Sequence, residues 1–229
     1  MSAKSLAIFV GIGVAALLIV AAMFAKSDVD LSFFEPPAAN TQPRFITSAI
    51  PGRDHSRGAE EPELYWIVYT DFECPYCKQL HPEMEQIIAE YGDRVQWIFR
   101  HFPVTQLHLG SFEKAMASEC VAELGGEDAF WRFASLVFQR TEDNGQGLDV
   151  SQLPELAAAI GVNSTEFQSC LASGRFEERV TDDIMLGATS GVSGTPASFL
   201  IDANNKAQGL SGNITADRAR EILDNLLAE

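Results

Sequence analysis

The sequence predicts an α/β fold in which a block of helices interrupts a sheet. Three observations support this prediction. Residues 64 to about 103 follow the pattern strand, helix, strand; residues 108 to about 190 carry helical patterns throughout; and strand patterns return only beyond residue 194. A strand–helix–strand unit predicts two parallel strands joined by a right-handed crossover. The helical block is therefore expected to leave the sheet and return to it.

The first unit begins with a run that strongly favours a strand. Residues 64–70 consist mostly of aromatic and β-branched side chains, which are typical of a buried strand. A helix is expected over residues 75–91, where apolar side chains recur at helical spacing and Pro82 should kink the early turns. Alternation of apolar and polar side chains over residues 95–99 predicts the second strand.

Five helices are expected in the block that follows, separated by breaks rich in Gly or Asn. Their predicted ranges are 111–124, 128–139, 150–160, 164–172 and 176–189. Two further strands, at 197–201 and 207–210, flank Asn204-Asn205, a pair that suits a hairpin turn. An amphipathic helix over residues 215–227 is expected to follow them.

The composition is that of an ordinary globular protein. The chain has 229 residues, of which 46% are hydrophobic, and this suits one domain with an insertion and additional ends. Its 32 acidic residues against 16 basic residues give a net charge of −16. Such an excess argues against nucleic acid or an anionic membrane surface as a partner, because both attract Lys and Arg.

An apolar segment precedes the domain. Residues 5–25 carry no charge, and a helix of about 20 such residues spans about 30 Å, the thickness of the hydrocarbon core. We expect residues 1–25 to form an uncleaved transmembrane anchor, with a cleaved signal sequence as the alternative. Lys4 before the segment and acidic residues after it place the rest of the chain on the extracytoplasmic side in either case. Residues 26–60, rich in Pro and polar side chains, are expected to form a flexible tether.

Cys74 and Cys77 are the candidate catalytic residues. They enclose Tyr76 and Pro75, and the latter suits a first helical position because its missing N–H costs nothing there. Unpaired backbone N–H groups and the helix dipole stabilise a thiolate on the first cysteine, whose pKa in such settings falls to roughly 3.5–7.5. We expect Cys74 to exchange with the substrate and Cys77, one turn inward, to resolve the mixed disulfide.

The surroundings of this pair favour redox chemistry over metal binding. A Cys-x-x-Cys pair also opens many zinc sites, but zinc needs two further ligands and the other two cysteines are isolated. We therefore expect no metal and no organic cofactor. The sign of the electrostatic potential at Cys74 is not fixed by the sequence, because Lys78 and His81 add positive charge whereas Asp71 and Glu73 add negative charge.

Three segments of the chain resemble the DsbA-like branch of the thioredoxin superfamily. They are residues 70–77, which contain the two cysteines, residues 100–103 and residues 191–197. The resemblance covers residues 61–229. It implies a thioredoxin-like fold with an inserted helical domain at about 108–190, and disulfide exchange with cysteine-containing protein substrates.

The resemblance gives an active-site role to Thr195 and Pro196. In this family the proline is cis, its loop lies against the redox disulfide, and the preceding residue offers its backbone to the substrate. An X-Pro bond is the place where a cis peptide costs only about 0.5–1 kcal/mol.

The sequence departs from the family pattern at Val68, where many members carry a buried acid that serves the second cysteine. We do not transfer that role to Asp71 or Glu73.

Cys120 and Cys170 need a separate explanation. Each stands alone in a predicted helix of the insertion. They can be two buried free thiols, or a structural disulfide between the two helices, which suits an exported protein and which we favour. Such a bond would close a loop of about 50 residues and stabilise the fold by about 3–4 kcal/mol.

The sequence therefore predicts a monomeric, membrane-anchored thiol–disulfide oxidoreductase with its catalytic domain outside the cytoplasm. We expect it to oxidise folding proteins, and the resemblance implies a membrane partner that reoxidises it. A reductase or a disulfide isomerase of the same family is the nearest alternative, because Pro75-Tyr76 alone does not fix the redox potential. A non-catalytic binding or assembly module is an alternative of another class, which the intact cysteine pair and Thr195-Pro196 disfavour.

Overall fold

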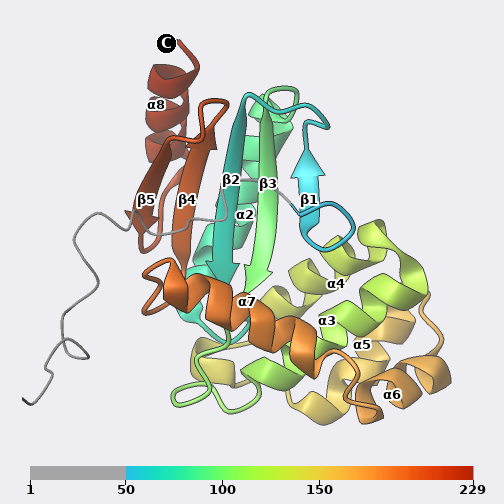
Figure 1. The fold of residues 1–229 in the computed structure, drawn as a ribbon. Helices are drawn as coiled ribbons and strands as arrows, with labels where there is room; N and C mark the ends of the chain where they lie inside the picture. Colours follow the sequence, from blue (N-terminus) through green and yellow to red (C-terminus); the bar gives the residue numbers. More distant parts are fainter. Residues whose placement is uncertain (1–49, 229) are drawn as a thin grey trace, which may run out of the picture. The chain divides into compact units, whose positions relative to one another are not determined.

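A five-stranded sheet forms the centre of the computed structural model, which describes residues 50–228 (Figure 1). The strand order is β1-β3-β2-β4-β5. Their bounds are β1 His55–Gly58, β2 Leu64–Thr70, β3 Val95–His101, β4 Ala197–Asp202 and β5 Ala207–Ser211. β2 and β3 are parallel, whereas β1 with β3, β2 with β4, and β4 with β5 are antiparallel. The parallel crossover expected from the strand–helix–strand pattern is confirmed.

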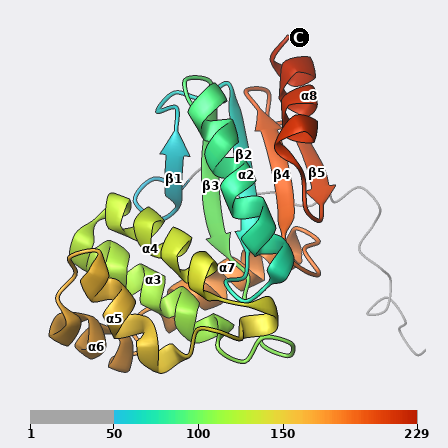
Figure 2. The same ribbon diagram turned by 180° about the vertical axis from the view of Figure 1, so that it is seen from behind.

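Helices cover both faces of this sheet, and further helices form the insertion (Figures 1 and 2). α2 (Pro75–Tyr91) and α8 (Ala216–Leu227) lie side by side on one face, and α7 (Glu177–Thr189) crosses the other. The insertion follows β3 and contains α3 Ser111–Gly125, α4 Glu127–Arg140, α5 Leu153–Ala159 and α6 Ser164–Ala172, with 3-10 turns at Asp143–Gly145 and Val150–Gln152. The predicted α/β fold with a helical insertion is therefore confirmed.

The alternating side chains of β2 divide the interior into two parts. Trp66 and Val68 belong to the main core, which also contains the apolar side of α2 and most of the insertion. Ile67 and Tyr69 belong to a smaller cluster on the face that α7 covers. A strand that is buried on both faces needs a near-continuous apolar run. This need explains why β2 was recognisable from sequence.

β1 is an element that the sequence does not predict. Its residues lie within the range 26–60 that the sequence analysis assigns to a tether, and its four residues are His, Ser, Arg and Gly. The strand pairs with β3 at the edge of the sheet. Next to it, Arg100 of β3 forms a buried 2.7 Å ion pair with Asp54. Part of the assigned tether therefore belongs to the sheet, held by long-range pairing that a short polar segment does not reveal.

The other N-terminal expectations lie outside the described residues. The anchor expected at residues 5–25 and most of the tether precede residue 50. Across residues 50–228, no helix combines the length and the apolar character that crossing a bilayer requires.

A disulfide joins two helices of the insertion. Cys120 of α3 and Cys170 of α6 are bonded, with their Cα atoms 5.9 Å apart and 50 residues of sequence separation. Both residues are buried and belong to the main core. The structure thus contains the disulfide rather than two free thiols.

Removal of this disulfide should destabilise the protein. Opening a loop of 50 residues gives the unfolded chain additional entropy worth about 4 kcal/mol. We expect the double variant Cys120→Ala/Cys170→Ala to lose about this much free energy of unfolding in urea denaturation, relative to the parent protein with Cys74 and Cys77 unchanged in both. Equal stability of the two proteins would contradict a stabilising role for the bond.

Candidate active site

The two cysteines of the motif lie where β2 meets α2. β2 ends at Thr70, and a turn of three residues leads to Cys74. Cys74 is the N-cap residue of α2, with the extended backbone typical of that position, and Pro75 begins the helix. Cys77 follows in the first turn. Because β2 is the central strand, these residues occupy a fixed place at one end of the sheet.

The loop before β4 lies against Cys74. The peptide bond between Thr195 and Pro196 is cis. In its protonated form the Cys74 thiol donates a hydrogen bond of 3.2 Å to the carbonyl oxygen of Thr195. β4 is the neighbour of β2 in the sheet, which explains how residues so distant in sequence meet. The structure thus brings together the cysteine pair and the Thr195-Pro196 loop that the sequence singles out.

The two thiols differ in their acidity. Both are free, and Cys74 and Cys77 are 5% and 2% exposed. A hydrogen bond from the Cys77 thiol, together with backbone N–H groups of the first turn, outweighs burial and lowers the pKa of Cys74 to about 6. Burial, together with the neighbouring Cys74 thiolate, raises the pKa of Cys77. At pH 7 Cys74 is therefore mainly a thiolate and Cys77 a thiol.

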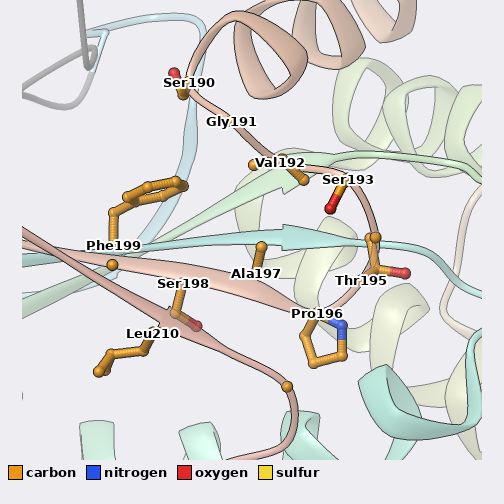
Figure 3. Close-up of a pocket in the computed structure, with 13 residues that line it drawn as sticks. Ser190, Gly191, Val192, Ser193, Thr195, Pro196, Ala197, Ser198, Phe199 and Leu210 are labelled. Carbon is orange, nitrogen blue, oxygen red and sulfur yellow. The ribbon is translucent and has the colours of Figure 1, made fainter. Parts of the chain in front are cut away.

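A pocket of about 360 Å³ lies beside the cis-proline loop. Residues 190–199 form one side of it and residues of β5, including Leu210, form the other (Figure 3). Gly191 and Gly194 of this loop have no side chain and therefore line the pocket with backbone atoms. Tyr76 of the motif is itself 57% exposed. The end of the molecule that carries Cys74 thus offers both exposed backbone and an exposed aromatic ring.

The charges around the motif differ from those that the sequence suggests. His81 is buried, and burial lowers its pKa to about 3, so its ring is neutral at pH 7. Lys78 extends towards the insertion, where its Nζ donates a 2.6 Å hydrogen bond to the carbonyl oxygen of Thr141. The positive charge that the sequence analysis attributes to His81 is therefore absent.

Glu73, which directly precedes Cys74, is buried and paired. Its carboxylate forms a 2.5 Å ion pair with Lys114 of α3 and accepts a 3.2 Å hydrogen bond from the backbone N–H of Gly110. Lys114 is also buried. The insertion thus supplies the cation that compensates the carboxylate nearest to Cys74. The sequence does not reveal this partner, because no local pattern connects residues 41 positions apart.

Asp71 connects the motif loop to the segment that follows β3. Its buried carboxylate accepts hydrogen bonds from the backbone N–H groups of Glu73 and Val104, at 2.8 and 2.7 Å, and from Nδ1 of His108 at 2.8 Å. Val68, which stands at the position of the missing acid, packs in the main hydrophobic core. The carboxylates of Asp71 and Glu73 are thus engaged elsewhere, which agrees with not assigning them the role of the acid that Val68 replaces.

Comparison with known proteins identifies the family. A family model described as thioredoxin matches residues 51–225. The chain belongs to the thioredoxin family. Its fold resembles that of DsbA2 from Pseudomonas aeruginosa, with a TM-score of 0.67 and 23% identity, covering 78% of this chain and 97% of that one. Oxidised BdbD from Bacillus subtilis gives a TM-score of 0.65 and 22% identity, covering 77% and 94%. These likenesses confirm the fold that the DsbA-like resemblance implied for this thioredoxin-family protein.

Curated relatives of this thioredoxin-family protein are much longer. A protein named Na(+)/H(+) antiporter NhaA 1 from Mycolicibacterium vanbaalenii is 29% identical over 197 residues, which are 85% of this chain and 31% of that protein. One named Na(+)/H(+) antiporter NhaA from Herminiimonas arsenicoxydans is 33% identical over 174 residues, 76% of this chain and 26% of that protein. The chain therefore spans about a third or less of the length of these relatives.

The acidity of Cys74 predicts how the reduced protein reacts with iodoacetamide. Because the thiolate is the nucleophile, we expect the alkylation rate to rise with pH through a midpoint near 6. Peptide mass spectrometry should locate the product at Cys74. The Cys77→Ala variant removes the hydrogen bond that stabilises the thiolate and should raise the midpoint. A midpoint in the parent protein near the ordinary value of about 8.5 would contradict the assignment.

Because Glu73 and Lys114 form a buried ion pair, the effects of substituting them on the free energy of unfolding should not be additive. Lys114→Met leaves the Glu73 carboxylate without its cation and should lower the free energy of unfolding by about 3–5 kcal/mol. The double variant Glu73→Gln/Lys114→Met leaves no charge uncompensated and should recover most of this loss. Urea denaturation of both variants checks the expectation. A double variant no more stable than Lys114→Met would show that the pair is not the source of the loss.

Proposed function

We propose that the protein introduces disulfides into cysteine-containing proteins on the extracytoplasmic side of a membrane. The observation that carries this proposal is the contrast between Cys74, whose pKa is lowered to about 6, and Cys77, whose pKa is raised. A stable thiolate on the exchanging cysteine stabilises the reduced form of the couple. The corresponding disulfide is then a stronger oxidant.

The size of this effect shows what has to be measured. Lowering a thiol pKa from 9 to about 6 stabilises the reduced form at pH 7 by about 1.4 kcal/mol, which is about 30 mV for a two-electron couple. The couples of this superfamily range from about −270 mV in thioredoxin to about −120 mV in DsbA. Thiolate stabilisation thus favours the oxidising end without reaching it alone, and the redox potential itself is the deciding quantity.

The proposed reaction transfers two electrons from a client dithiol to the disulfide form of the protein. A client thiolate attacks Sγ of Cys74, which breaks the Cys74–Cys77 bond, and Cys77 takes up a proton because its pKa is high. A second client thiolate attacks the client sulfur of the mixed disulfide. The client disulfide forms and Cys74 leaves as a thiolate, a step that its low pKa favours.

The cis-proline loop is the proposed binding place for the client. The Thr195 carbonyl oxygen lies within hydrogen-bond distance of Cys74, and the adjoining pocket runs along backbone with few large side chains. An extended client segment would pair with this backbone as a strand pairs with a sheet edge. Such pairing selects conformation rather than sequence, which suits an enzyme that acts on many proteins.

The proposed location rests on two features. Residues 5–25 are apolar and uncharged, as a single membrane anchor requires. The Cys120–Cys170 disulfide suits an oxidising compartment, where structural disulfides persist. We therefore propose a monomeric domain, held at the outer side of a cell membrane by one span and reoxidised by a membrane partner.

The redox potential of the Cys74–Cys77 couple, equilibrated against glutathione, tests the proposed direction. We expect a value between about −180 and −120 mV. The oxidised protein should also form disulfides in a reduced client, and Cys74→Ser should abolish this activity whereas Cys120→Ala/Cys170→Ala should retain it. A potential near −270 mV would favour a reductase instead. A rate of client disulfide formation that the parent protein raises no more than Cys74→Ser does would point to a non-catalytic binding module.

A further inference from the structure

Two histidines and a glutamate converge in the interior, away from the redox motif. His55 on β1, His101 at the end of β3 and Glu119 on α3 each place one ligand atom within 4.8 Å of the other two. The three residues are 6%, 1% and 5% exposed. They come from the edge strand, the central part of the sheet and the insertion, so the cluster lies where these three parts of the domain meet.

Both histidine Nε2 atoms face the same carboxylate. Nε2 of His101 is 2.9 Å from one oxygen of Glu119, and Nε2 of His55 is 3.3 Å from the other. His55 Nε2 makes no hydrogen bond of good geometry to any described residue, although it is buried. This nitrogen is therefore buried and directed at the Glu119 carboxylate, but without a hydrogen bond of good geometry.

The far side of the His55 ring has the partner that a metal-binding histidine usually has. Its Nδ1 is 2.9 Å from the carboxylate of Glu127. Because a carboxylate accepts hydrogen bonds, this contact places the proton on Nδ1 and leaves the lone pair of a neutral ring on Nε2. Carboxylate partners of this kind fix the tautomer of histidines that bind metals. Phe130 stacks on the same ring at 3.5 Å between centroids and holds its plane.

We propose that His55, His101 and Glu119 bind a divalent transition metal ion, for which Zn²⁺ is the best fit. Two imidazole nitrogens and one carboxylate oxygen form a donor set that suits zinc, whereas calcium and magnesium prefer oxygen ligands. A cavity of about 650 Å³ borders His55 and Glu119. It gives an ion a route to the cluster and provides room for a water molecule as fourth ligand.

The charges around the cluster are compatible with a bound dication. Nε of Arg179 lies 3.5 Å from Glu119, where it competes with a metal for the carboxylate. The same guanidinium is bound by the buried carboxylate of Asp183 at 2.6 Å and by the carbonyl oxygen of Arg53 at 2.7 Å. These two partners hold the guanidinium in place, and the Asp183 carboxylate, which also binds Arg53 at 3.0 Å, offsets part of its charge.

In the metal-free protein, the carboxylates beside His55 favour its protonated ring. Burial alone would lower the pKa of His55, but the carboxylates of Glu119 and Glu127 outweigh it and raise the pKa to about 9. Metal binding requires a neutral histidine and therefore displaces this proton. The proposed ion would replace a protonated ring as the group that links β1, β3 and α3.

Titration of the oxidised full chain with Zn²⁺ tests this site, because the Cys74–Cys77 disulfide then removes the thiolates as competing ligands. Calorimetry should detect one equivalent of zinc per chain. Co²⁺ in its place should give visible d–d absorption without a thiolate-to-cobalt band. At a free Zn²⁺ concentration about 100 times Kd, Tm should rise by roughly 5–10 °C. Absence of binding by the oxidised parent protein would overturn the proposal.

Variants separate binding at this cluster from binding elsewhere. His55→Gln and His101→Gln should each abolish the equivalent of bound zinc, whereas His81→Gln, which changes a buried histidine outside the cluster, should keep it. Glu127 is half-exposed and contacts His55 from outside, so Glu127→Gln should fold normally and weaken affinity by about 10–100-fold. Unchanged affinity in both His55→Gln and Glu127→Gln would overturn the proposal, independently of any effect of substitutions on folding.

Discussion

The buried carboxylate of Asp71 holds the redox end of the molecule together. It follows the last residue of β2 directly and accepts hydrogen bonds from the motif loop and from the segment after β3. Without it, two backbone N–H groups would lose their partner, at a cost of about 1–3 kcal/mol for each one left buried and unsatisfied. β2 is held in place by side chains packed on both of its faces. The Asp71 carboxylate binds the loop after this strand and so fixes Cys74 and the first turn of α2 relative to the sheet.

The acidity of Cys74 then arises from very local contacts. The side chains that seem basic in the sequence are not among the main causes: His81 is neutral, and Lys78 extends to a carbonyl oxygen of the insertion. The nearest carboxylate, on Glu73, is compensated by Lys114. What remains is the hydrogen bond from Cys77 and the N–H groups of the helix start. The insertion therefore serves the redox site by neutralising a charge rather than by adding one.

Features with a local pattern can be predicted from the sequence. The buried strand β2, the helix with Pro75 at its start and the hairpin at Asn204-Asn205 all follow from spacing and turn chemistry, and Asn205 adopts the positive φ that such a turn needs. Thr195-Pro196 has no such pattern, and only the family resemblance singled it out. β1 stayed hidden because three polar residues and a glycine at a sheet edge carry no periodic signal.

Long-range pairs are the other class that the sequence could not reveal. Lys114 contacts Glu73 across 41 residues, and His108 contacts Asp71 across 37 residues. The sequence around these residues contains no pattern from which the contacts could be predicted. The same is true of His55 and His101, which lack the close spacing by which metal ligands are usually recognised. Only the sheet order, with β1 beside β3, brings these two histidines together.

The shared core limits how such a domain can be changed or rebuilt. Trp97 of β3 and Trp131 of α4 pack with 4.5 Å between their ring centroids, so the sheet and the insertion fill one continuous interior. Interiors packed to this density tolerate little change in volume at a single position. The insertion therefore shares its core with the sheet: a helical block grafted from another protein would have to match the shape that Trp97 presents, and a change of volume on one side favours a compensating change on the other.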